Sequence, residues 1–281
     1  MNNCIVCNNT DNRKLYTGIV QCQECGHIFS DLSLSEGELC GLYDEGYFFG
    51  NEYYDYLSDR KVSEKNFELR LRILRKFIEP NRHKSLLEVG CAYGFFLAMA
   101  KDLFEVSLGV DITKDGIRYA KEILGLNAIN AEFLTYDLGC RKFDVVCMWD
   151  TIEHLLNPRL YIEKIAGHIE EGGLLAITTG DVDSINARLN KDRWRLIHPP
   201  THMHYFSRRT LAKLLDENGF DIVYNRYCGF YRSLGMAAHG ARILNKSMPR
   251  LNTFLKRSGL DRCNFYLNLY DIMYVVARKR K

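Results

Sequence analysis

The stretch Leu86–Leu97 constrains the fold of this chain more than any other. It reads LLEVGCAYGFFL, an apolar run that ends in an acidic residue, followed by two glycines and then a second apolar segment. This order predicts a strand, a tight glycine turn and a helix, the opening unit of a parallel α/β sheet. Gly90 would let the backbone approach a ligand closely, and Gly94 would let the helix pack tightly on the strand. A second apolar strand, 106–111, ends in Asp111, another carboxylate at the same edge of the sheet.

Apolar runs and helical patterns alternate along the rest of the chain. Strands are expected at residues 85–89, 106–111, 128–130, 143–148, 174–178, 222–227 and 270–277. Helices are expected after Gly94, near Asp115, after Pro158 and from Ser207. Strands that alternate with helices predict an α/β protein with a doubly wound, Rossmann-like sheet of seven strands, the last of which pairs with 222–227 at one edge.

An amphipathic helix is expected over residues 63–79, ahead of the sheet. Phe67, Leu71 and Leu74 share one face, and Pro80 should stop the helix. We expect this helix to lie across the entrance of the sheet. Residues 231–262 give no pattern that we can place.

Composition bounds the classes of function. A chain of 281 residues with 47% hydrophobic residues is long enough for one large domain and one small one. The net charge of +3 is too small to argue for a nucleic-acid partner. No apolar run approaches the roughly 18 residues of a membrane span, and the polar N-terminus lacks signal-peptide features. We therefore expect a cytoplasmic protein whose ten cysteines are thiols or metal ligands.

Two Cys-x-x-Cys pairs lie close to the N-terminus. They are Cys4 with Cys7 and Cys22 with Cys25. Two knuckle turns of this kind complete a tetrahedral four-thiolate zinc site, which is structural because it leaves no open coordination position. So short a segment buries too little apolar surface to fold alone, so the metal would stabilise it.

Aromatic residues crowd the segment 43–56, where no helical period emerges. They either pack the small module onto the large domain or form a lid whose phenols meet a polyhydroxylated substrate. We divide the chain into a Cys4 module (1–45), an aromatic linker with the amphipathic helix (46–84), and an α/β domain (85–281) that carries an insertion at 181–206.

Taken together, these motifs resemble those of class I S-adenosylmethionine-dependent methyltransferases, over about residues 60–281. The resemblance rests on Glu88-x-Gly90-x-Ala92-x-Gly94, on Asp111, on Asp150-Thr-Ile-Glu153-His154, and on the segment PPTHMHYFS at 199–207. A cysteine-rich zinc module ahead of such a core is similar to the arrangement in sugar C-methyltransferases and other enzymes of surface polysaccharides.

The resemblance implies which residues would hold S-adenosylmethionine. Gly90 and Ala92 would bring backbone close to its methionine part, Glu88 would fix the turn and the amino group, and Asp111 would accept both ribose hydroxyls. The adenine would lie between Ile112 and the segment of Glu132 and Phe133. Two further residues, Trp149 and Asp150, would complete the donor site. Many relatives have glycine at the position of Ala92, and we expect a negative φ there, at which alanine is unstrained.

Glu153 and His154 follow the strand 143–148, where this fold class binds ligands. His154 would act as the general base, or as the orienter, that removes the acceptor proton, because an imidazole titrates near neutrality. The structural alternative is that Glu153 and His154 are a helix cap and its partner. A third alternative is a divalent-metal site for Mg²⁺ or Mn²⁺ built from Asp150, Glu153 and His154, similar to a pattern in some quinone O-methyltransferases.

The insertion after the strand 174–178 holds three histidines within seven residues. They are His198, His202 and His204, and we expect at least one, with His202 the foremost, to touch the substrate. Arg195 would pair with a phosphate or carboxylate of the acceptor. The arrangement lacks a thiolate that would complete a second zinc site.

The leading hypothesis is therefore methyl transfer to a small polar acceptor, a sugar or glycan such as a nucleotide sugar or a surface polysaccharide. An RNA methyltransferase with a zinc ribbon is the alternative among enzymes, although we do not expect a nucleic-acid partner, and an inactive binding protein on the same fold is the alternative outside them. The sequence leaves open a homo-oligomer and names neither the acceptor nor the atom that is methylated.

Overall fold

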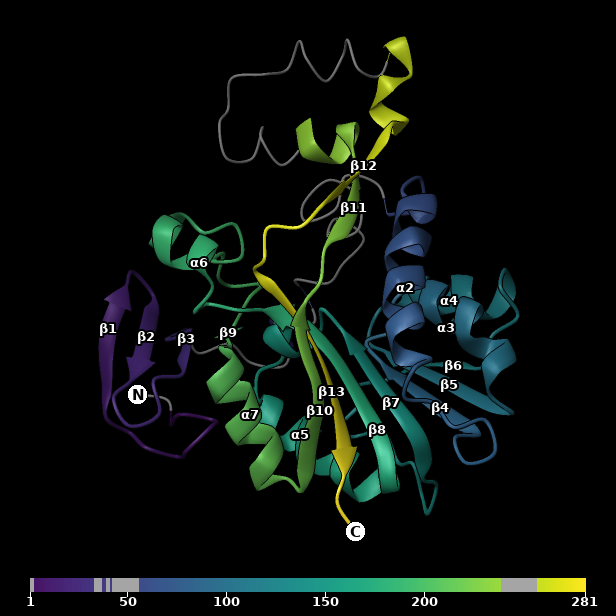
Figure 1. Cartoon of the computed structure of the whole chain (residues 1–281), viewed down its shortest axis with the longest axis horizontal. Coiled ribbons are helices and arrows are strands. Elements are labelled where there is room, and N and C mark those ends of the chain that lie inside the picture. The colour runs from purple at the N-terminus through teal and green to yellow at the C-terminus, as the bar shows by residue number, and fades with distance from the viewer. Residues whose placement is uncertain (1–2, 33–36, 39–40, 42–55, 239–256) are drawn as a thin grey trace.

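A computed structural model describes residues 3–32, 37–38, 41, 56–238 and 257–281. The described residues form three sheets and the helices that cover them (Figure 1). Residues 43–55 of the aromatic segment and residues 239–256 of the unassigned segment lie outside the described residues. The lid hypothesis is therefore not tested. Within the described part of the chain, no helix is long and apolar enough to cross a membrane.

The central sheet has seven strands in the order β10-β13-β8-β7-β4-β5-β6. The strands are β4 (Ser85–Val89), β5 (Val106–Asp111), β6 (Ala128–Asn130), β7 (Phe143–Trp149), β8 (Ile169–Gly180), β10 (Phe220–Tyr227) and β13 (Ile272–Lys279). The ladders from β6 to β8 are parallel, and β13 is antiparallel to both β8 and β10. This confirms the predicted α/β fold and its seven-stranded doubly wound sheet.

Helices cover both faces of this sheet (Figure 1). The first face packs the side chains of α2 (Arg60–Leu74), α3 (Phe95–Ala100) and α4 (Lys114–Glu122) into one buried cluster. The second packs α5 (Pro158–His168) and α7 (Arg208–Glu217) into the other. Adjacent residues of β4 separate them, since Leu86 belongs to the first cluster and Leu87 to the second. This alternation is the period of two that a strand imposes on its side chains.

The N-terminal module forms a second sheet of four strands. Three of them, β1 (Asn12–Tyr16), β2 (Ile19–Cys22) and β3 (Ile28–Ser30), come from the module itself, but the fourth, β9 (His204–Tyr205), comes from the insertion. The module shares the hydrophobic core of the α5 and α7 face, to which it contributes Phe29. The guanidinium of Arg159 on α5 also donates hydrogen bonds to the carbonyls of Ile5 and Val6, at 2.7 and 2.6 Å.

Several predicted boundaries were wrong. The helix α2 ends at Leu74 rather than at Pro80, because its last turn tightens: the amides of Lys76 and Phe77 donate to carbonyls three residues back. β8 begins before Gly172-Gly173 rather than after it. The insertion also contains the short helix α6 (Ile185–Asn190). The unassigned segment 231–262 begins within β11 (Phe230–Ser233), which pairs with β12 (Asn264–Leu267) just beyond the end of that segment.

Gly94 should be intolerant of a side chain. Its φ is +75°, and a Cβ there would lie 2.8 Å from Leu126 and 3.0 Å from Ala120. The close approach at Gly94 is therefore to α4 and to the loop after it, not to the strand as predicted. We expect Gly94→Ala to lower the free energy of unfolding by about 2–4 kcal/mol, from the left-handed backbone and from overpacking together.

The matched control is Gly167→Ala on α5, which meets open space and should be neutral or slightly stabilising. Urea denaturation of both variants gives the comparison. Equal stability of the two variants would contradict the packing role of Gly94.

Candidate functional site

A cavity of about 250 Å³ opens at the carboxyl ends of the parallel strands. All but one of the residues expected to hold the methyl donor line it. The lining residues are Glu88, Gly90, Ala92, Asp111, Ile112, Glu132, Phe133, Trp149 and Asp150. The exception is Gly94, which caps α3 behind the turn. His154 lines the same cavity, whereas Glu153 and His202 are not in its lining.

The turn after β4 is built on positive φ angles. Gly90 has a φ of +78°, and a Cβ on it would lie 2.6 Å from the side chain of Thr151, so only glycine fits. The expectation of a negative φ at Ala92 was wrong, since its φ is +46°. The amide of Ala92 donates to Oδ2 of Asp111 at 2.7 Å, and this bond holds the backbone in a conformation that costs alanine roughly 1 kcal/mol. Ala92 nevertheless lines the cavity.

Glu88 lies at the end of β4 with 2% of its surface exposed. Its Oε2 atom has no hydrogen-bond partner among the described residues. Burial, reinforced by the nearby carboxylate of Asp111, raises the pKa of Glu88 well above its ordinary value. A buried acid that lines a cavity and has one unpartnered oxygen is suited to a cationic ligand group, because a positive charge there would compensate its burial.

Asp111 organises the turn as well as lining the cavity. Its Oδ1 accepts hydrogen bonds from the amide and hydroxyl of Thr113, at 2.8 and 2.6 Å, while Oδ2 accepts the amide of Ala92. Burial raises the pKa of Asp111, and these hydrogen bonds oppose that shift. Oδ1 thus accepts two hydrogen bonds and Oδ2 accepts one, so the carboxylate keeps one lone pair, on Oδ2, for a hydroxyl rather than for the two hydroxyls that were expected.

The segment after β6 is clamped from α5. The ammonium of Lys164 donates to the carbonyls of Phe133, Leu134 and Tyr136, at 2.7, 2.9 and 2.5 Å, and lies 5.0 Å from the ring centroid of Phe133. Sequence reasoning missed Lys164, because nothing local to residue 164 marks the three carbonyls that it joins. One cation thereby fixes the wall of the cavity formed by Glu132 and Phe133.

Trp149 and Asp150 end β7 at the cavity. Asp150 has a φ of +49° and forms an ion pair with Arg70 of α2. Its Oδ1 also accepts a hydrogen bond from Thr178 at 2.8 Å. The guanidinium of Arg70 lies over the ring of Trp149, 5.6 Å from its centroid. Arg70 was not foreseen, since it lies far away in the sequence on a helix that was expected to be structural.

Glu153 and His154 lie in a short 3-10 turn, Ile152–His154. His202 of the insertion lies beside them. One ligand atom of each residue falls within 4.8 Å of the others, and Asp150 is outside this group. Burial lowers the pKa of His154 to about 4 and raises that of Glu153 to about 8. Burial and the neighbouring imidazoles also lower the pKa of His202. The three side chains therefore form an uncharged cluster near neutral pH.

The tautomer of His154 follows from its partner. Nδ1 of His154 lies 2.9 Å from the carbonyl oxygen of Thr201, which can only accept, so Nδ1 carries the proton and Nε2 keeps its lone pair. The expectation that the pKa of His154 lies near neutrality was wrong, because burial holds it near 4. His154 is consequently a neutral imidazole at pH values near 7, with no proton on Nε2.

Other residues of the insertion have structural partners. Arg195 pairs with the buried carboxylate of Asp271 at 2.9 Å, and Trp194 donates to the same carboxylate at 3.0 Å. The guanidinium of Arg195, which was expected to pair with a phosphate or carboxylate of the acceptor, is therefore engaged with Asp271. His204 lies against His27 of the module, away from the cavity lining.

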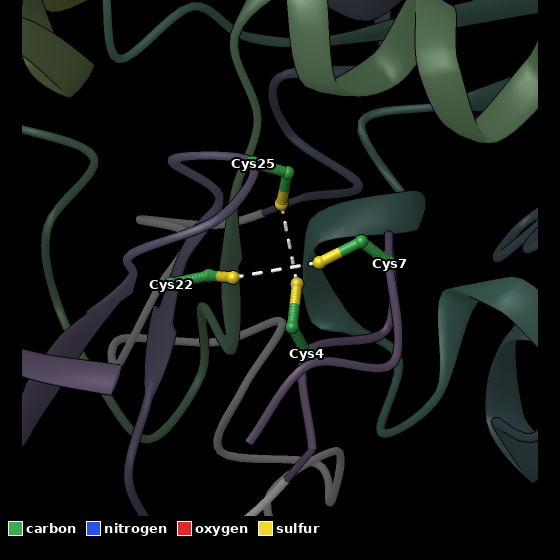
Figure 2. A group of neighbouring side chains, drawn as sticks. All are labelled: Cys4, Cys7, Cys22 and Cys25. Atoms are coloured by element: carbon green, nitrogen blue, oxygen red, sulfur yellow. Dashed lines mark hydrogen bonds between the residues drawn. The ribbon is translucent and has the colours of Figure 1, made fainter. Parts of the chain in front are cut away.

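The four N-terminal cysteines converge on one point (Figure 2). Their sulfur atoms all lie within 4.8 Å of one another, with Cys4 3.4 Å from Cys25 and Cys7 3.5 Å from Cys22. Four thiols on two knuckle turns fit a tetrahedral zinc ion. Burial raises the pKa of the Cys25 thiol to about 11, so metal binding would have to displace its proton.

Comparison with known proteins decides the family. The model of the methyltransferase domain family matches residues 58–225, the part of the chain that forms α2 and most of the sheet. The chain belongs to this family. The methyltransferase domain thus accounts for the cavity at the ends of β4, β5 and β7, and the match begins after the cysteine module.

Curated relatives are ubiquinone biosynthesis O-methyltransferases. The mitochondrial protein of Rattus norvegicus is 23% identical over 190 residues, which cover 58% of this chain and 55% of that protein. The protein of Glaesserella parasuis is 26% identical over 106 residues, 34% of this chain and 45% of that protein. The chain therefore spans about half the length of these relatives.

Solved structures share the fold. A SAM-dependent methyltransferase from Archaeoglobus fulgidus superposes with a TM-score of 0.55 at 20% identity, covering 81% of this chain and 100% of that one. An S-adenosylmethionine-dependent methyltransferase from Clostridium acetobutylicum gives a TM-score of 0.53 at 12% identity, with 80% and 97% covered. At these identities the likeness concerns the fold.

The cysteine cluster predicts one zinc ion per chain by elemental analysis. We expect Cys7→Ser to lose the metal and to lower the thermal midpoint, because the module shares the core of α5 and α7. The exposed Cys140 provides the matched control, and Cys140→Ser should keep both the metal and the midpoint. Metal-free wild type with an unchanged midpoint would contradict a structural zinc.

Proposed function

We propose that this protein transfers the methyl group of S-adenosylmethionine to a small polar acceptor. The observation that carries the proposal is a cavity lined by both His154 and Glu88, a buried acid whose Oε2 has no hydrogen-bond partner among the described residues. S-adenosylmethionine has a cationic amino group, a ribose and an adenine, and the cavity offers a buried acid, Asp111 and the wall of Phe133 to these three parts.

The protein's own groups would act mainly by position. Glu88 would hold the amino group, Asp111 a ribose hydroxyl, and the clamped Phe133 segment the adenine. The bound donor supplies an activated methyl group on a sulfonium. His154, unprotonated and with Nε2 as the acceptor atom, would take the proton of the acceptor as that methyl is transferred. Glu153 and His202 would hold His154 from behind and keep water away.

A sugar or glycan is the acceptor that we favour, as a nucleotide sugar or a surface polysaccharide. Its support is the order of the chain, a four-cysteine module ahead of the methyltransferase domain. A quinol is the second candidate, supported by the names of the curated relatives. Mass spectrometry of glycans, nucleotide sugars and quinones from cells with and without the gene tests both. A methyl group that disappears from the quinone pool alone would remove the sugar proposal.

The donor site predicts a crossed pattern of affinities. Glu88→Gln should weaken S-adenosylmethionine about tenfold or more, since a neutral amide replaces the partner of the amino group. The same variant should bind 5′-methylthioadenosine, which lacks that amino group, as the wild type does. Asp111→Ala should weaken both ligands by about 1–3 kcal/mol, because the ribose is common to them.

Isothermal calorimetry gives these affinities. The control is Asp115→Ala, which removes an acid of α4 that pairs with Arg118 on the surface, and this variant should bind both ligands normally. If S-adenosylmethionine gives no heat of binding with the wild type, the protein is not a methyltransferase but a binding protein on the same fold. Equal losses of both ligands in Glu88→Gln would remove the assigned amino contact.

The cluster of Glu153, His154 and His202 also has the donor set of a divalent-cation site, two imidazoles and a carboxylate. We assign it to proton transfer and expect the imidazole of His154 to titrate in NMR spectra near pH 4, with or without added Mg²⁺. The neutral, proton-accepting form is the one present above that value. An imidazole that stops titrating when Mg²⁺ or Mn²⁺ is added would show a metal ligand instead.

A further inference from the structure

The short strand β9 lies between the cysteine module and the turn that carries His154. On one side it pairs with β3, where the amide of Ser30 donates to the carbonyl of Met203 at 2.8 Å. On the other side the amide of Met203 donates to the carbonyl of Glu153, also at 2.8 Å. A strand of two residues cannot persist alone, so its position depends on both neighbours.

A pair of buried histidines follows the same route. His27, two residues after Cys25, is fully buried, and His204 is 5% exposed. Nε2 of His27 lies 3.1 Å from Nδ1 of His204, and Nε2 of His204 lies 3.3 Å from the carbonyl oxygen of Leu156. The two rings stack with centroids 5.4 Å apart.

We call the hydrogen bonds from His27 through His204 to Leu156 the histidine relay. The positions of its hydrogens can be assigned from Leu156. The carbonyl of Leu156 can only accept, so His204 donates through Nε2 and therefore accepts through Nδ1. His27 must then donate through Nε2, which leaves its Nδ1 without a proton. That nitrogen is indeed without a hydrogen-bond partner among the described residues. Both rings are consistent as neutral imidazoles, in agreement with the buried setting.

We propose that His27 and His204 are positioning residues that couple the fold of the cysteine module to the loop 150–157, and so to His154. The effect of this coupling on catalysis rests on the proposed function, but the structural coupling itself does not. The module would thus be part of the active-site scaffold: without its metal, β3 would not hold β9, and β9 would not hold Glu153 and Leu156. His202, next to Met203 in the chain, would lose its place beside His154 in the same step.

Two variants of His204 divide the relay into its halves. In His204→Gln the side-chain amide can reproduce Nε2 and still donate to Leu156. In His204→Asn the side-chain oxygen can reproduce Nδ1 and accept from His27, but nothing reaches Leu156. Hydrogen exchange measured by mass spectrometry reports the protection of peptides that cover 150–157 and 198–206 in each zinc-loaded variant.

We expect His204→Asn to speed exchange in 150–157 about tenfold, and His204→Gln to keep it within about twofold of wild type. Both should retain zinc, because all four cysteine ligands are unchanged. Rescue by glutamine but not by asparagine separates positioning through Leu156 from simple packing. Equal exchange in both variants, whether fast or slow, would overturn the proposal.

Removal of the metal from wild type with a chelator tests the other half of the relay. We expect protection to fall in 3–30, 198–206 and 150–157 together, while β5 at 106–111 stays protected as an internal control. Loss confined to 3–30 would overturn the coupling. Calorimetry with S-adenosylmethionine on the same samples keeps the two proposals apart, since a protein that binds no donor can still show or lack the coupled exchange.

Discussion

The hydrogen bond from the amide of Ala92 to the carboxylate of Asp111 is the constraint on which the site depends. It joins the turn after β4 to the end of β5, and it holds Ala92 at a φ of +46°. The bond places backbone where a donor would have to lie and orients the carboxylate at the same time. Asp111, the proposed ribose ligand, is therefore also a structural residue, because its carboxylate oxygens already hold the turn.

Buried acids with an unpartnered oxygen occur both in the cavity lining and in the cluster beside it. Glu88 and Glu153 are both buried acids with an unpartnered oxygen among the described residues, and burial raises the pKa of each. His154 shows the opposite shift for the same reason, since burial disfavours whichever form is charged. A site of this kind costs folding free energy when empty and gains from a ligand that brings the missing charge or proton.

The cysteine module is joined to the methyltransferase domain rather than merely tethered to it. It contributes side chains to the core of α5 and α7, receives two hydrogen bonds from Arg159, and completes its sheet with a strand from the insertion. This joint sheet would give the proposed zinc site a structural role, separate from the proposed methyl transfer. Backbone hydrogen bonds connect the module, through β9 and Met203, to the turn that carries His154.

The sequence by itself determined the local units of the fold and the donor side of the site. The strand β4, the glycine turn, Asp111 after β5 and the helix that follows Ser207 all obey short-range rules of period, turn chemistry and capping, and each was found where it was expected. The same rules failed at Ala92, whose φ is set by a hydrogen bond to a residue on another strand.

Only the tertiary structure decided which distant residues meet. Arg70 reaches Asp150, Arg195 and Trp194 reach Asp271, and His27 reaches His204 across 177 positions of sequence. Such contacts have no local pattern, because they depend on how helices and loops cross the finished sheet. The order of residues thus specified the chemical groups along the edge of the sheet, and packing chose the partners that set their charge and orientation.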